Sequence, residues 1–97
     1  MYYVFFSNLS NELKVDIIEC LKKTEKNVTE ISTELKVEQS KISHALHSLK
    51  ECNIVNSKQI GKNRIYSLNK KTIIPILKII DRHARTYCNN CCNCRRK

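Results

Sequence analysis

The chain has 97 residues, of which 41% are hydrophobic and 28% charged, and its formal net charge at pH 7 is +9. This length supports one domain with a single modest core and disfavours an enzyme with a deep cleft. No segment approaches the roughly 18 consecutive apolar residues of a membrane span, and the opening MYYVFF lacks the pattern of a signal peptide, so we expect a soluble cytoplasmic protein without a membrane partner.

The charge is divided unevenly between the two halves of the chain. Residues 1–51 hold seven Lys against eight acidic residues, for a net charge of −1, whereas residues 52–97 hold eleven Lys and Arg against Asp81 alone, for a net charge of +10. Such asymmetry favours a polyanionic partner, most simply a nucleic acid, although a basic surface can also serve solubility.

The first part of the chain predicts two helices. Residues 1–8 are rich in aromatic side chains and predict a short helix or an arm, whose apolar surface the domain itself or a partner chain should cover. Ser10 is the expected N-cap of the next helix, which runs to about Lys23. Within that helix Cys20 lies on the apolar stripe, and we expect it to be a small core residue rather than a ligand.

Residues 27–54 have the pattern of two short helices joined by a tight turn. The first, about Thr29 to Leu35, follows Asn27, and Glu30 three residues later completes the pattern of a capping box. The second begins near Gln39 or Ser40 and ends at Glu51 or Cys52, and we refer to it as the reading helix. Its apolar residues recur at i, i+3, i+4 and i+7, which is the stripe of an amphipathic helix: they are Ile42, Ala45, Leu46 and Leu49.

The other face of the reading helix carries short hydrogen-bonding side chains. Side chains of this size can enter the major groove of DNA and bond base edges or phosphates. The candidate DNA-binding residues of this helix are Gln39, Ser40, Lys41, Ser43, His44 and His47. An ordinary solvated helix face would be similarly polar. The DNA-binding interpretation therefore depends on the elements that flank this helix in the chain.

After the reading helix the apolar period changes from about 3.6 to about 2 residues, which predicts a hairpin. We expect strands over residues 54–59 and 64–68, with Gly61 supplying a positive φ at the tip. Lys62 and Arg64 make the tip basic. A basic hairpin directly after a reading helix is typical of a wing that reaches adjacent phosphates or the minor groove. The alternative is an exposed hairpin with solubilising charges.

A last helix is predicted from Thr72, its expected cap, to about Tyr87, with Pro75 in the first turn. Its apolar surface is wider than one small domain needs, so part of it should bury against a second copy of the chain. A symmetric homodimer would present two reading helices to half-sites about one helical turn apart. The sequence therefore predicts a mostly α winged helix-turn-helix with a small β-hairpin over residues 1–87, dimeric through its terminal helices, and a cysteine-rich basic tail over residues 88–97.

This order of elements resembles the ArsR/SmtB family of winged-helix repressors. The resemblance is carried by LSNELKVDIIECLKK at residues 9–23, VTEISTELKVEQSKISHALHSLKECNIV at residues 28–55 and IGKNRIYSL at residues 60–68. It implies a homodimer that binds double-stranded operator DNA and leaves the DNA when a metal or metalloid binds. We expect no enzymatic activity, because no nucleophile, base and orienting group appear in a recognisable arrangement.

The metal sites of that family match this chain only in part. The cysteine pair of the founding members would fall at residues 28–32, which contain no Cys. The zinc-type site needs Asp-x-His at the start of the terminal helix, but Lys70 and Thr72 stand there, and only His83 matches near the end. Asp81 and His83 do form an Asp-x-His, yet it lies a helix length too late to correspond.

Four of the six cysteines fall in the last ten residues, a clustering that favours metal or thiol chemistry over a disulfide framework. They are Cys88, Cys91, Cys92 and Cys94. Three thiolates suit As(III), whereas four suit Zn(II) or Cd(II). We therefore expect a repressor that such an ion releases from its operator. The alternatives are a structural zinc site or a redox-sensing tail on the same DNA-binding domain and, in another class, a winged-helix protein-interaction module.

Overall fold

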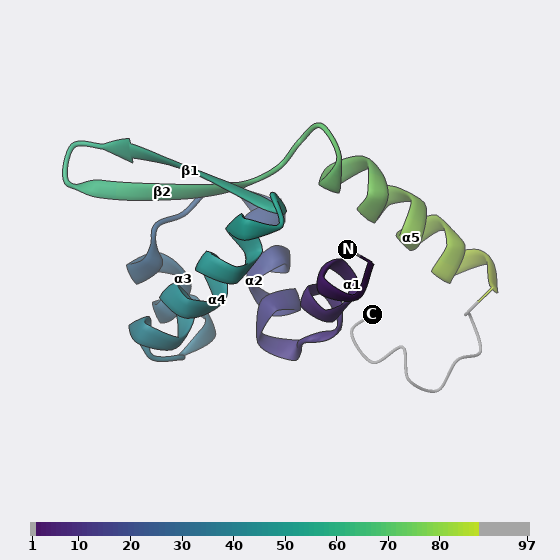
Figure 1. Ribbon diagram of the computed structural model, residues 1–97, viewed down its shortest axis with the longest axis horizontal. Coiled ribbons are helices and arrows are strands. Elements are labelled where there is room, and N and C mark those ends of the chain that lie inside the picture. The colour runs from purple at the N-terminus through teal and green to yellow at the C-terminus, as the bar shows by residue number, and fades with distance from the viewer. Residues whose placement is uncertain (1, 88–97) are drawn as a thin grey trace.

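The computed structural model describes residues 2–87, which form five helices and one two-stranded antiparallel hairpin. The elements are α1 Tyr2–Ser10, α2 Glu12–Lys23, α3 Val28–Leu35, α4 Gln39–Glu51, β1 Val55–Ile60, β2 Asn63–Leu68 and α5 Ile73–Tyr87. The helices α2, α3 and α4 gather beneath the hairpin, and α5 extends away from them (Figure 1). This arrangement confirms the predicted class, a mostly α winged helix-turn-helix with a small hairpin.

The core lies where α2, α3 and α4 meet the base of the hairpin. The predicted stripe of the reading helix is buried throughout: Ile42, Ala45, Leu46 and Leu49 are at most 4% exposed. From α2 and α3, Ile17 and Ile31 pack into this core with no exposed surface. Burial of each such side chain contributes about 1.5–3 kcal/mol relative to exposure. Cys20 is 3% exposed, which confirms it as a core residue.

The start of α2 differs by one residue from the prediction. Asn11, not Ser10, is the N-cap, and its side chain accepts a hydrogen bond from the backbone N–H of Lys14 at 3.0 Å. Ser10 instead ends α1, where its hydroxyl donates to the carbonyl of Ser7 at 3.1 Å. Both residues are good caps. Asn11 is selected because α1 continues through Ser10 and the chain first turns extended at Asn11.

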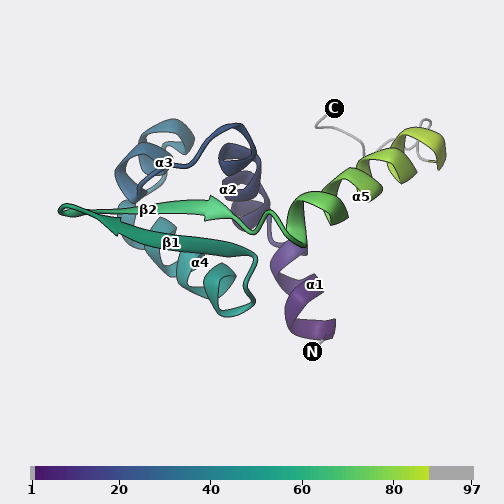
Figure 2. The same ribbon diagram turned by 90° about the horizontal axis from the view of Figure 1, so that it is seen from above.

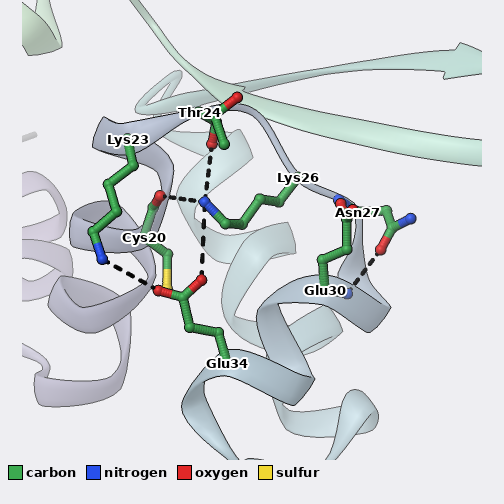
Figure 3. Close-up of polar contacts among 7 residues, drawn as sticks. All are labelled: Cys20, Lys23, Thr24, Lys26, Asn27, Glu30 and Glu34. Atoms are coloured by element: carbon green, nitrogen blue, oxygen red, sulfur yellow. Dashed lines mark hydrogen bonds and ion pairs between the residues drawn. The ribbon is translucent and has the colours of Figure 1, made fainter.

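The start of α3 is capped as predicted. The side chain of Asn27 accepts from the backbone N–H of Glu30 at 2.8 Å, and the Glu30 carboxylate accepts from the backbone N–H of Asn27 at 2.9 Å (Figure 3). Two orphan donors at the helix end are thus satisfied reciprocally.

The turn between α3 and α4 is closed by one serine. Lys36 adopts a left-handed conformation with φ 58°, and the backbone N–H of Val37 donates to the carbonyl of Ser32 at 3.2 Å. The Ser32 hydroxyl in turn donates to the carbonyl of Val37. After α4, Asn53 adopts a left-handed conformation with φ 58°, which asparagine accepts more readily than most residues.

The strands differ from the predicted ones by one residue: β1 begins and ends one residue later, and β2 begins one residue earlier but ends at Leu68 as predicted. Ile60 pairs with Asn63, so the turn contains only Gly61 and Lys62, and Gly61 has the predicted positive φ of 61°. A two-residue turn with such a glycine lets both flanking residues remain in the strands. Ile54 is not in β1, because its backbone N–H closes the turn after α4.

The helices α1 and α5 leave large apolar side chains exposed. They lie on the side of the molecule away from the tip of the hairpin (Figures 1 and 2). On α1, Tyr2 and Tyr3 are 75% and 91% exposed, and on α5, Ile79 and Tyr87 are 57% and 75% exposed. The described chain therefore presents the uncovered apolar surface that the sequence predicts. Between residues 2 and 87 no helix has the length and apolar character that a membrane crossing requires.

Candidate nucleic-acid interface

The predicted polar face of α4 is exposed to solvent. All six candidate residues lie on it: Gln39, Ser40, Lys41, Ser43, His44 and His47. Because the opposite face fills the core, the helix is held through one side and presents the other. The amide of Gln39 also donates to the Thr29 hydroxyl at 3.4 Å, which links the first residue of α4 to the start of α3.

His47 has an acidic neighbour that the sequence interpretation missed. Its Nε2 lies 3.4 Å from the Glu51 carboxylate one turn later, and the two side chains are 72% and 70% exposed. A pair this solvated contributes little to stability. This contact therefore leaves His47 available to other partners, although Glu51 adds negative charge at this end of α4.

A hollow of about 410 Å³ separates the start of α2 from α4. It is lined on the α4 side by Ser40, Lys41 and His44, and on the α2 side by Asn11 and Lys14. Asn11 and Lys14 were not among the sequence candidates. Helical periodicity predicts which face of a helix is buried, but it does not predict which other element lies beside that helix. The candidate interface thus includes the first turn of α2.

The wing brings the second group of candidate residues. Lys62 and Arg64 are exposed at its tip, which projects past α3 (Figure 1). The Arg64 guanidinium donates to the Ser57 hydroxyl across the strands at 3.4 Å. Lys26, in the loop before α3, is joined to Tyr66 by two backbone hydrogen bonds. The N–H of Lys26 donates to the carbonyl of Tyr66 at 3.0 Å, and the N–H of Tyr66 donates to the carbonyl of Lys26 at 2.8 Å. This isolated β-bridge fastens the wing to the loop before α3.

Behind this surface, a polar cluster joins α2 to α3 (Figure 3). The ammonium of Lys26 donates to the backbone carbonyl of Cys20 at 2.8 Å and lies 3.9 Å from the Glu34 carboxylate, which also lies 3.5 Å from the ammonium of Lys23. Burial, together with the hydrogen bond to Glu34, raises the pKa of the Cys20 thiol to about 11. The same hydrogen bond lowers the pKa of Glu34, and the two lysines add to that effect. Cys20 is therefore a protonated thiol at neutral pH, a poor metal ligand and a poor nucleophile.

In residues 2–87, no group of three or more His, Cys, Asp or Glu side chains is arranged to hold a metal ion. Asp81 forms an ion pair with Lys22 at 3.7 Å, and the ring of His83 packs against that of Tyr87 with centroids 4.8 Å apart. The four predicted metal ligands, Cys88, Cys91, Cys92 and Cys94, lie outside the described residues, so their role stays a prediction.

Comparisons with known proteins agree with this fold. The family model described as "Bacterial regulatory protein, arsR family" matches residues 11–57, which include α2, α3 and α4. The transcriptional repressor SmtB homolog of Synechocystis sp. is 27% identical over 79 residues, which are 81% of this chain and 60% of that protein. The chain thus spans about three fifths of the length of this curated relative.

Two solved structures match over most of the chain. HlyU from Vibrio cholerae superimposes with a TM-score of 0.74 at 25% identity, covering 91% of this chain and 92% of HlyU. A homodimeric winged helix-turn-helix DNA-binding domain from Mycobacterium bovis superimposes with a TM-score of 0.83, covering 92% of this chain and 82% of that one, and at 18% identity it shares the fold.

The fold is that of a winged helix-turn-helix domain. The match of residues 11–57 to the arsR family model agrees with the resemblance that the sequence predicted.

Proposed function

We propose that this protein is a transcriptional repressor that binds double-stranded DNA. The observation that carries the proposal is α4, whose apolar face is buried and whose opposite face presents short hydrogen-bonding side chains. Such a helix enters the major groove, and the basic wing then reaches neighbouring phosphates or the minor groove. The match of residues 11–57 to a family of bacterial regulatory proteins supports this function over an enzymatic one.

The proposed DNA-binding form is a homodimer. The exposed apolar residues of α1 and α5, such as Tyr3 and Ile79, would be covered by the same helices of a second copy. The homodimeric state of the related Mycobacterium bovis domain supports this arrangement. Sedimentation equilibrium should give twice the mass of the chain, and changing Ile79 to Glu should shift the mass toward that of one chain.

DNA binding is tested first by its dependence on salt. Duplexes selected from a random pool serve as operator, and unselected duplexes as the reference. Changing Lys62 or Arg64 to Ala should weaken binding to both kinds of DNA and reduce the slope of log affinity against log salt by about 1. Changing Lys71 to Ala, an equal loss of charge outside α4 and the wing, is the control. A slope that is unaltered in the wing variants would remove the wing from the interface.

Sequence recognition is tested by the ratio of operator to random affinity. A good base contact contributes about 1–3 kcal/mol, so changing Ser43 or His44 to Ala should lower this ratio roughly 5- to 150-fold. Changing Thr86 to Ala on α5 should leave it unchanged. If the wild type shows neither a preference for selected duplexes nor a steep salt dependence, the protein-interaction module becomes the better interpretation.

We further propose that ion binding by the tail cysteines releases the protein from DNA. Four thiols within seven residues are a donor set that suits thiophilic ions such as As(III), Cd(II) and Zn(II). The test is operator binding titrated with each ion under reducing conditions, for the full chain and for a variant with all four tail cysteines changed to Ser. The wild type should lose operator affinity, and the variant should bind the operator as tightly but not respond.

The alternative roles of the tail predict different outcomes in the same experiment. A structural zinc site predicts that the Ser variant loses stability or dimerisation, and a redox-sensing tail predicts a response to oxidant but to none of the ions. Absence of any ion response in the wild type would sink the sensor proposal.

A further inference from the structure

Asn8 is buried in a helix that is otherwise exposed or half-buried. It is 2% exposed, while its neighbours on α1 include the exposed Tyr3 and Phe6. Burying a polar amide is unfavourable unless its hydrogen bonds are made. Within residues 2–87, Asn8 is the buried residue with a polar side chain. Its hydrogen-bond partners therefore show which elements the buried amide joins.

The partners of Asn8 come from two other helices. Its Oδ1 accepts from the Lys14 ammonium at 2.8 Å and from the Ser48 hydroxyl at 3.1 Å, and its Nδ2 donates to Cys52 Sγ at 3.1 Å. The Lys14 ammonium also donates to the Ser48 hydroxyl at 3.0 Å. One amide therefore joins α1 to α2 and to the reading helix α4. We refer to Asn8, Lys14, Ser48 and Cys52 as the Asn8 network.

The network holds α4 along the border of its candidate DNA-binding face. Ser48 and Cys52 are separated by one helical turn, at the end of α4 and at its C-cap. Lys14 also lines the hollow that His44 and other interface residues border. Apolar packing is not directional, so the core alone tolerates small rotations or translations of α4. Hydrogen bonds weaken steeply with angle and distance, so the network restricts those movements.

We propose that Asn8 is a positioning residue for DNA recognition, which holds the reading helix in the orientation that sequence-specific binding requires. This inference rests on the proposed DNA-binding function. Asn8 acts through Ser48 and Cys52 and does not contact DNA itself.

The test compares variants that break the network with one that preserves it. Changing Asn8 to Ala removes all three of its hydrogen bonds, and changing Ser48 to Ala removes the two that Ser48 makes and leaves the rest. Changing Asn8 to Asp keeps an acceptor for Lys14 and Ser48, and its second oxygen can accept from the Cys52 thiol. Changing Ile18 to Val, a buried residue of α2 outside the network, is the control for a loss of stability alone.

The Asn8→Ala and Ser48→Ala variants should lower the ratio of operator to random affinity roughly tenfold. This factor corresponds to the net contribution of about one hydrogen bond. Their affinity for random DNA should stay the same, because no basic residue of the wing or of α4 is changed. The Asp variant should recover most of the ratio, and the Ile18 variant should keep it. If the Asn8→Ala and Ser48→Ala variants keep the wild-type ratio, or if the Ile18 variant loses as much, the positioning role is wrong.

A second measurement needs no DNA. Backbone amide chemical shifts of the Ser48→Ala and Asn8→Ala variants should change along α4 as far as Ser43 and His44, because the whole helix adjusts. Changes confined to α1 and to the immediate neighbours of Ser48 would overturn the inference. If the wild type does not prefer selected duplexes, the proposed function fails, and the chemical shifts alone then decide whether Asn8 positions α4.

Discussion

Two lysines share the carboxylate of Glu34, and they offer a test of which contact stabilises the packing of α2 on α3. The ammonium of Lys23 is the closer one, at 3.5 Å against 3.9 Å for Lys26. The side chain of Lys23 is 73% exposed, however, and that of Lys26 only 12%. Lys26 also donates to the carbonyls of Cys20 at 2.8 Å and Thr24 at 3.4 Å. Distance alone would favour Lys23, whereas burial favours Lys26.

The magnitudes decide between the two lysines. A solvated pair such as Lys23 with Glu34 contributes about 0–1 kcal/mol. Lys26 satisfies the Cys20 carbonyl, one of the orphan acceptors in the last turn of α2, and a hydrogen bond to a charged group contributes about 1.5–3 kcal/mol. Changing Lys26 to Met keeps the length of the side chain and removes its charge and its donors. We expect this change to lower the free energy of unfolding by about 2 kcal/mol, and the same change at Lys23 by less than about 1 kcal/mol.

Both variants should be measured by urea and thermal unfolding at one protomer concentration, because association would make the apparent stability depend on concentration. For a domain of this size, about 2 kcal/mol corresponds to a fall in Tm of roughly 8–16 °C. Equal losses from the two lysines, or a larger loss from Lys23, would refute the reasoning that burial outweighs distance at this cluster.

Further predictions concern three single residues. Changing Asn27 to Ala removes one half of the capping box and should lower the free energy of unfolding by about 1 kcal/mol, measured by urea denaturation. Changing Lys36, whose φ is 58°, to Gly should raise the unfolding free energy by about 0.5–1 kcal/mol, whereas changing it to Ala should not. The Cys20 thiol, with its pKa raised from 9.0 to about 11, should react with iodoacetamide at pH 8 at least about 100-fold more slowly than in the unfolded chain, as followed by peptide mass spectrometry. Because the unfolded thiol loses its proton first, the stability that Cys20 contributes should be complete below pH 9 and lost between pH 9 and 11; a Cys20→Ala variant should lack that loss.

Much of the fold could be predicted from the sequence because it depends on residues that are close together in the chain. The spacing of the apolar residues in the reading helix identified its buried face, and the Asn27–Glu30 pattern identified the start of α3. Gly61 has the positive φ that the sequence predicted for the tip of the hairpin. The boundary between α1 and α2 was misplaced by one residue, because two adjacent residues can both cap a helix.

The candidate interface was predicted in part for the same reason. Periodicity separated the exposed residues of α4 from its buried ones, but it could not show that the first turn of α2 borders the same surface. The contact of Glu51 with His47 was missed, because the sequence interpretation considered only the polar residues of the candidate face and not the acidic residue one turn after His47.

The sequence by itself determined the elements, their order and the polar face of α4, since each follows from local spacing and capping chemistry. Only the tertiary structure decided that Asn8, on the aromatic-rich helix α1, is buried against Ser48, which lies 40 residues further along the chain. It also decided that the side chain of Lys26 is buried while that of Lys23 is exposed. These roles depend on where separate helices meet. No pattern within one helix encodes that meeting, because it is set by the packing of all of them together.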